Sequence, residues 1–175
     1  MSGLTFTCGD DGAASGVLIA AALHLKARGE PLWPEASLTP ERLARYYPQE
    51  GWRVAWRGGV ALGCLCLLDV DPLFWPDDPP GEALYLHKLA VHPDARGQGL
   101  SALLLREAAR ETRERGRPWL KLDTATARPK VRAIYENFGF QDAGQRTVKG
   151  FDVTLYRLPI EMGEAEARAA HPDLR

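Results

Sequence analysis

The chain has 175 residues, of which 45% are hydrophobic and 26% charged, as is typical of one soluble globular domain with a substantial core. Its formal net charge of −1 gives no electrostatic basis for binding nucleic acid or an anionic membrane. The three cysteines fit neither a disulfide framework nor a zinc site, so we expect a reducing, cytoplasmic setting and no bound metal.

The first part of the sequence predicts an edge strand, two helices and a hairpin. The strand covers residues 4–8 and the first helix residues 11–28, whose apolar run is too short to span a bilayer. Thr39 and Pro40 are typical of the cap and first position of a second, short helix. Strands over residues 52–56 and 60–68 flank Arg57-Gly58-Gly59, which is a hairpin signal. Cys64 and Cys66 alternate along the second strand and should pack as small apolar residues.

The second part of the sequence alternates strands and helices. An irregular, proline-rich loop over residues 70–81 leads into a buried strand over residues 83–91. Further elements are expected at residues 100–115 (helix), 119–123 (strand), 129–138 (helix), 140–148 (strand) and 151–158 (strand). This order predicts a mixed α/β sheet in a single domain over residues 1–160, followed by a polar tail over residues 161–175.

A glycine-containing turn precedes the long helix. After the strand, the chain passes through Arg96-Gly97-Gln98-Gly99 and enters the helix at about Leu100. The first backbone N–H groups of a helix lack partners within it and lie at the positive end of its dipole. Such a helix start is suited to a phosphate, and we interpret it as the pyrophosphate site of a nucleotide-bearing cofactor.

One interpretation of this turn is a nicotinamide dinucleotide site. Gly97, Gly99 and Ala102 satisfy G-x-G-x-x-A, and Asp123 ends the next strand, where an acid that binds a ribose would lie. However, residues 92–96 separate the strand from Gly97, whereas fingerprint glycines follow their strand almost at once. The chain before the turn also lacks a repeated strand–helix alternation, which makes this the weaker alternative.

The other interpretation is a resemblance to a known family. Residues 96–101 resemble R/Q-x-x-G-x-G/A, the coenzyme A-binding signature of the GNAT N-acetyltransferase superfamily, and residues 89–91 with Pro93 match the strand and turn that usually precede it. Residues 134–140 resemble the Y-E-x-x-G-F motif of the same family. Two positions depart from the pattern: Ser101 replaces the final Gly or Ala, and Arg128 stands where many members have an Asn that caps the last helix.

The resemblance implies a fold, a cofactor and a reaction. The fold would be the GNAT-type acyl-CoA N-acyltransferase fold, a central mixed sheet of six to seven strands flanked by about four helices. In this fold two central strands splay apart, and the pantetheine arm of acetyl-CoA occupies the gap. The reaction would be direct acetyl transfer to a primary amine of a small molecule or peptide, and a homodimer is a family-level expectation. The expected cofactor-binding residues are Leu89, Ala90, Val91, Arg96, Gly97, Gln98, Gly99, Leu100, Ser101 and Arg128.

Two side chains are candidates for proton transfer. Family tyrosines at the position of Tyr135 point at the cofactor sulfur, and a phenol is protonated at neutral pH, so Tyr135 is the candidate general acid. The alternative is a core tyrosine on the apolar face of its helix. His87 precedes the pantetheine-binding segment and is the candidate base or water relay, the alternative being a histidine bonded within the sheet. Glu82 and Asp123 are reserve bases.

A loop of acids and aromatic residues is the candidate acceptor site. Residues 69–78 place four acids around Phe74 and Trp75, a composition that suits a cationic amine. The expected substrate-binding residues are Trp33, Asp71, Trp75 and Tyr85. The alternative is a rigid surface loop whose aromatic side chains pack into the core. A non-catalytic acyl-CoA-binding or sensing domain is the second class of function, and it would need residues 96–101 without Tyr135 or His87.

Overall fold

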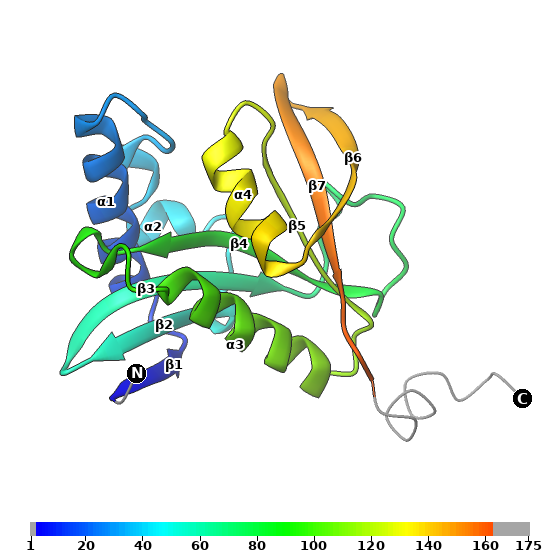
Figure 1. The fold of residues 1–175 in the computed structure, drawn as a ribbon, viewed down its shortest axis with the longest axis horizontal. Coiled ribbons are helices and arrows are strands. Elements are labelled where there is room, and N and C mark those ends of the chain that lie inside the picture. The colour runs from blue at the N-terminus through cyan, green and yellow to red at the C-terminus, as the bar shows by residue number, and fades with distance from the viewer. Residues whose placement is uncertain (1–2, 163–175) are drawn as a thin grey trace, which may run out of the picture. The chain divides into compact units, whose positions relative to one another are not determined.

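The computed structural model describes residues 3–162, which form two compact units. Unit 1 contains residues 3–68 and 87–104, and unit 2 contains residues 69–86 and 105–162. The helices and strands, in chain order, are β1 (Leu4–Cys8), α1 (Asp11–Ala27), η1 (Glu35–Ser37), α2 (Pro40–Leu43), η2 (Gln49–Gly51), β2 (Trp52–Arg57), β3 (Val60–Leu68), β4 (Ala83–Val91), η3 (Pro93–Ala95), α3 (Leu100–Glu114), β5 (Trp119–Ala125), α4 (Pro129–Phe138), β6 (Gln141–Val148) and β7 (Phe151–Pro159) (Figure 1).

The strand order confirms the predicted fold class. The described strands are hydrogen-bonded in the order β1-β2-β3-β4-β5-β7-β6, which makes a seven-stranded mixed sheet, and residues 3–162 contain four α-helices. The single domain predicted for residues 1–160 stays a prediction. Most of the predicted tail, residues 163–175, lies outside the described residues. None of the helices described combines the length and apolar character that crossing a bilayer requires.

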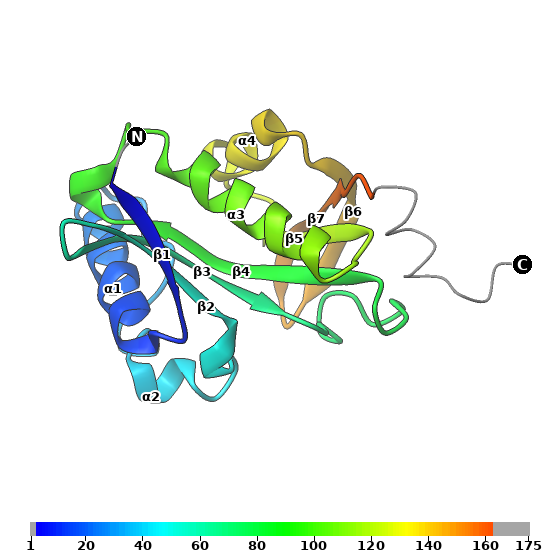
Figure 2. The same ribbon diagram turned by 90° about the horizontal axis from the view of Figure 1, so that it is seen from below.

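Unit 1 is built from an antiparallel meander and the helix that packs on it. β1 pairs with β2, and β2 pairs with β3 across the predicted hairpin. α1 lies against β2 and β3 (Figure 2). It buries Val17 and Leu18 in a core that also contains Trp52 and Cys64. Local signals set the helix starts, because the Asp10 side chain accepts a hydrogen bond from the Ala13 N–H at 2.9 Å and Thr39 caps α2 as predicted.

Strand β4 contains an irregularity that the sequence did not predict. Its parallel pairing with β5 covers four residues, from Ala83↔Trp119 to Leu86↔Leu122. Two residues beyond Leu86, Lys88 has φ of +55°, a left-handed conformation inside a strand. Such a residue interrupts the period-two alternation of a strand. The side chains after Lys88 therefore do not continue the alternation of faces that precedes it.

The start of α3 approaches β3 closely at a glycine. A Cβ atom on Gly63 would lie 2.8 Å from Leu104 Cδ1 and 3.2 Å from the carbonyl oxygen of Ala90. Leu104 is fully buried. The missing side chain at Gly63 therefore sets how near the first turns of α3 come to the strands of unit 1.

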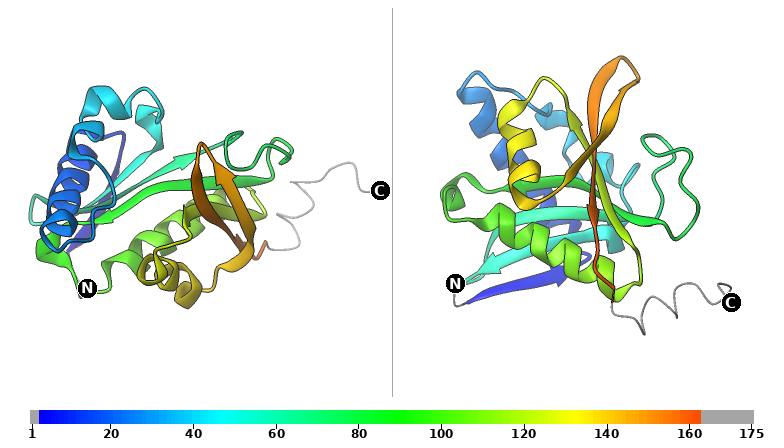
Figure 3. Two further views of the ribbon diagram at one scale, coloured as in Figure 1. Left: turned by 90° about the horizontal axis from the view of Figure 1, so that it is seen from above. Right: turned by 45° about the vertical axis from the view of Figure 1, so that its right-hand side comes forward.

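Unit 2 is built on β5, β7 and β6. β7 pairs antiparallel with both neighbours, and the β6–β7 hairpin forms a long twisted ribbon (Figure 3). Its turn contains Lys149 and Gly150, both with positive φ, as the predicted turn requires. α4 contacts β5 and ends at Gly139, whose φ of +118° confirms the predicted stop.

The loop between β3 and β4 is anchored by a buried lysine. Lys121 of β5 is 5% exposed. Its Nζ lies 2.7 Å from Asp78 Oδ2 and 3.7 Å from Glu82 Oε1. The Tyr85 hydroxyl donates a hydrogen bond to the same Asp78 oxygen at 2.7 Å. A buried ammonium is stable when carboxylates compensate it, so these contacts fix the loop on the sheet of unit 2.

We predict that Gly63→Ala destabilises the protein by about 1–3 kcal/mol, because the added methyl group overpacks the contact with α3. The measurement is chemical denaturation. The matched control is Gly16→Ala, since Gly16 lies within α1 with no atom within 4 Å of its added Cβ; there stability should stay the same or rise by up to ~1 kcal/mol. A Gly63→Ala protein as stable as the wild type would contradict the close approach.

We predict that Lys121→Met lowers the free energy of unfolding by roughly 2–4 kcal/mol, because it leaves the Asp78 carboxylate without its buried cation. The same denaturation experiment measures it. Lys26→Met is the control, since Lys26 also forms an ion pair, with Glu35 at 2.9 Å, but its side chain is 64% exposed and screened by water. Equal unfolding midpoints for the two variants would refute the anchoring role.

Candidate functional site

The glycine turn before α3 has the open backbone that a phosphate site needs. Gly97 and Gly99 have φ of +74° and +73°, and no atom lies within 4 Å of a Cβ added at either. Both are exposed, and Leu100 begins a helix of 15 residues. Left-handed glycines turn the chain while keeping side chains away from the first N–H groups of the helix. The turn therefore fits the pyrophosphate of a nucleotide-bearing cofactor.

The guanidinium of Arg57 lies beside this turn. Arg57 Nη1 donates to Gln98 Oε1 at 3.0 Å, and Gln98 Nε2 donates to the carbonyl oxygen of Asp94 at 3.3 Å. These bonds hold Gln98 across the exposed turn and bring a guanidinium from the end of β2 next to it. Arg96, which sequence reasoning assigned to the cofactor, is also exposed. The Arg57 contact spans 41 residues, and no local pattern could have found it.

Unit 1 contains His87 together with the predicted pantetheine-binding segment, residues 89–91. The ring of His87 lies against that of Tyr47, with centroids 5.7 Å apart. Trp33, predicted as an acceptor wall, has Lys88 Nζ 4.7 Å from its ring centroid. The same ammonium lies 5.9 Å from the ring centroid of Tyr47.

Unit 2 contains Tyr135 in an aromatic cluster. The Tyr135 side chain is 7% exposed, and its ring packs against Phe140 at 5.8 Å and Tyr156 at 6.2 Å between centroids. Burial, and then the negative charge of Asp123, raise the pKa of Tyr135. Of the hydrogen bonds described for residues 3–162, none uses the Tyr135 hydroxyl. The phenol is therefore protonated at neutral pH, with a proton to donate.

Arg128 occupies the N-cap position of α4 in unit 2. Its side chain makes no capping hydrogen bond, which confirms that arginine does not replace the capping function of asparagine here. Its role toward a cofactor phosphate stays a prediction.

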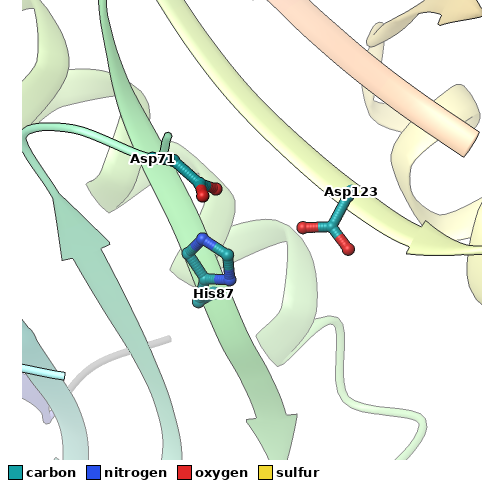
Figure 4. A group of neighbouring side chains, drawn as sticks. All are labelled: Asp71, His87 and Asp123. Atoms are coloured by element: carbon teal, nitrogen blue, oxygen red, sulfur yellow. The ribbon is translucent and has the colours of Figure 1, made fainter. Parts of the chain in front are cut away.

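Asp71, predicted for the acceptor site, and Asp123, predicted as a reserve base, come from different elements of unit 2. Figure 4 shows Asp71 in the segment between β3 and β4, Asp123 on β5, and His87 on β4. A carboxylate oxygen of Asp71 and one of Asp123 lie within 4.8 Å of each other. Two like charges at this separation favour a cation between or beside them.

Trp75 and Tyr85, the other predicted acceptor-site residues of unit 2, contact charged side chains of the protein itself. The Lys121 ammonium lies 4.6 Å from the centroid of the Trp75 ring, and Tyr85 donates to Asp78. Burial and the neighbouring Asp78 raise the pKa of Tyr85. Acid and aromatic side chains of the loop between β3 and β4 were predicted to bind the amine of a substrate. In the structure, the Lys121 ammonium contacts two of them, Trp75 and Asp78. The assignment of Trp75 and Tyr85 to the acceptor stays a prediction.

Two of the three cysteines lie in the core of unit 1. Cys64 and Cys66 are both fully buried, as predicted. Burial raises the pKa of both thiols, that of Cys66 to about 12. A thiol reacts as its thiolate, so burial disfavours the reactive form of both side chains.

Comparisons with known proteins agree on one family. The model of the Acetyltransferase (GNAT) family matches residues 20–140. N-acetyltransferase 8F1 of Rattus norvegicus is 32% identical over 100 residues, which are 56% of this chain and 42% of that protein. The chain therefore spans less than half of this relative.

Solved structures of similar fold cover most of the chain. One is yncA from Salmonella typhimurium, described with its cofactor acetyl-CoA, with a TM-score of 0.65, 21% identity, and coverage of 94% of this chain and 98% of that chain. Another is the ribosomal-protein-S18-alanine N-acetyltransferase from Escherichia coli, with a TM-score of 0.65, 23% identity, and coverage of 92% and 97%. At these identities the likeness shows the fold.

The family match covers well over half of the chain and includes the glycine turn, β5 and α4. It confirms the predicted family and, with it, acetyl-CoA as the cofactor. It also removes the dinucleotide alternative. This protein belongs to the GNAT acetyltransferase family.

Proposed function

We propose that the protein is an N-acetyltransferase that moves acetyl from acetyl-CoA directly to a primary amine, with both substrates bound together. The observation that carries the proposal is the bare, left-handed glycine turn at the start of α3, in a chain of the GNAT family. The turn supports binding of the pyrophosphate through backbone N–H groups. Arg96, Arg57 and Arg128 are the side chains we assign to its negative charge, and residues 89–91 those we assign to the pantetheine arm.

Acetyl-CoA, when bound, supplies a thioester carbonyl that a neutral amine can attack. The chain's own residues must then provide for the protons. Tyr135 holds a proton on its phenol oxygen, and its raised pKa keeps it there at neutral pH. We assign it the donation of this proton to the departing thiolate.

His87 is the residue we assign to the proton of the amine. An imidazole nitrogen can accept a proton directly or through a water molecule. The contact of its ring with Tyr47 limits the orientations of the imidazole. Glu82 and Asp123 stay reserve bases in the proposal.

For the acceptor, we propose an amine that arrives as a cation. The Asp71 and Asp123 carboxylates, within 4.8 Å of one another, would attract an ammonium group before it loses its proton. A small molecule and a peptide both satisfy this requirement. We also propose that the protein works in the cytoplasm and forms a homodimer.

Removing the Tyr135 hydroxyl should slow catalysis while leaving cofactor binding intact. We expect Tyr135→Phe to lower kcat roughly 10- to 100-fold, with an unchanged Kd for coenzyme A. The measurement is thiol release against an amine panel, with the acetylated product identified by mass. Tyr156→Phe is the control, because it removes a hydroxyl from the same cluster, one that is bonded to Arg132 and Glu136. Equal kcat in wild type and Tyr135→Phe would rule out the acid role.

The raised pKa of Tyr135 fixes the sign of its pH effect. An ordinary tyrosine loses its proton at about pH 10, and a raised pKa keeps the acid form beyond that point. We therefore expect no loss of kcat below about pH 10 that depends on Tyr135. An alkaline decline below this pH that vanishes in Tyr135→Phe would contradict the prediction.

If His87 receives the proton of the amine, removing its imidazole must slow the chemical step. We expect His87→Gln to lower kcat roughly 100-fold or more, with an unchanged Kd for coenzyme A, in the same thiol-release assay. Asp123→Asn, measured in parallel, should keep most of its kcat. An unchanged kcat in His87→Gln and a lost one in Asp123→Asn would transfer the role to Asp123.

A further inference from the structure

Lys88 holds an unusual backbone conformation in the middle of β4. Among residues 3–162, the residues other than glycine with positive φ are Lys88 at +55° and Lys149 at +49°. Lys149 lies in a hairpin turn, where this conformation is ordinary. Lys88 lies inside a strand, where a residue with a Cβ keeps a left-handed conformation only if its surroundings impose it.

The surroundings of Lys88 can impose it through the side chain. Lys88 Nζ lies 4.7 Å from the ring centroid of Trp33 and 5.9 Å from that of Tyr47, both within the range of a cation–π interaction. We name this contact the aromatic clamp. The carbonyl oxygen of Lys88 lies 3.7 Å from Cys64 Sγ, a weak donor that is equally far from the carbonyl oxygen of Ala14.

The aromatic clamp is itself supported by the core of unit 1. Trp33 and Tyr47 pack against the buried cluster that contains Trp52. The Tyr47 and Trp52 rings meet edge to face, with centroids 5.6 Å apart. Because Trp52 is fully buried, this contact anchors the Tyr47 ring to the core of unit 1.

Lys88 lies between two parts of the candidate site, so its backbone conformation affects how they are oriented. It follows His87 directly and precedes residues 89–91 directly. A left-handed residue between them sets the angle between the His87 side chain and the following backbone. The Tyr47 ring contacts both His87 and Lys88, which links the two side chains.

We propose that Lys88 is a positioning residue: the aromatic clamp holds its left-handed backbone and so fixes residues 89–91 relative to His87. The inference rests on the proposed function, because that function assigns residues 89–91 to the pantetheine arm and His87 to the amine proton. Lys88 itself does not touch the reacting atoms.

The test is a double-mutant cycle read out as the Kd for coenzyme A by titration calorimetry. Lys88→Met and Trp33→Leu should each weaken binding, by about 3- to 30-fold for Lys88→Met. The double variant should be no weaker than the weaker-binding single variant, because both changes remove the same interaction. Lys88→Arg, which keeps the cation, should restore binding to within about threefold of wild type.

Lys149→Met is the matched control, since it changes a lysine with the same backbone conformation that lies in a turn, and its Kd should equal that of wild type. An unchanged Kd in Lys88→Met, or additive losses in the double variant, would overturn the inference. In the protein without cofactor, the side-chain protons of Lys88 should show a ring-current shift in the NMR spectrum that Trp33→Leu reduces, and its absence in the wild type would also overturn the inference. A wild-type protein with this shift that does not bind coenzyme A would instead show that the proposed function has failed.

Discussion

The end of the parallel pairing between β4 and β5 is a constraint on the candidate residues of each unit. The strands pair from Ala83↔Trp119 to Leu86↔Leu122, and each continues beyond the last pair. The next residue of each strand is a candidate proton acceptor, His87 in unit 1 and Asp123 in unit 2. In β4 the left-handed backbone of Lys88 follows His87 directly. Each strand therefore has a candidate proton acceptor directly after its last residue in the parallel pairing.

The two units hold a lysine ammonium group in different ways. In unit 1 the Lys88 ammonium is stabilised by aromatic rings, whereas in unit 2 the Lys121 ammonium is stabilised by Asp78 and Glu82 and also covers Trp75. Each lysine takes up aromatic surface that the sequence analysis had assigned to the acceptor. Asp71 and Asp123 are consequently the groups of unit 2 on which our proposal for the amine rests.

The sequence predicted the elements well because their signals are local. The Thr39 cap, the Gly139 stop and the hairpin turn at Lys149-Gly150 each depend on a few neighbouring residues. The contacts of the site were missed because they join distant positions: Lys121 with Asp78 across 43 residues and Arg57 with Gln98 across 41. The left-handed backbone of Lys88 was missed because lysine has no preference for this conformation. The family motifs pointed to Tyr135, but its buried aromatic surroundings became visible in the structure.

The most direct test of this account is the thermal stabilisation of the purified protein by acetyl-CoA, free coenzyme A and NAD(H), measured side by side. A ligand present at 100 times its Kd adds about 2.7 kcal/mol to the free energy of unfolding, which gives a readily visible shift. The account predicts stabilisation by both coenzyme A species and none by NAD(H), because the glycine turn before α3 is assigned to the coenzyme A pyrophosphate. Stabilisation by NAD(H) alone, or by none of the three, would contradict it.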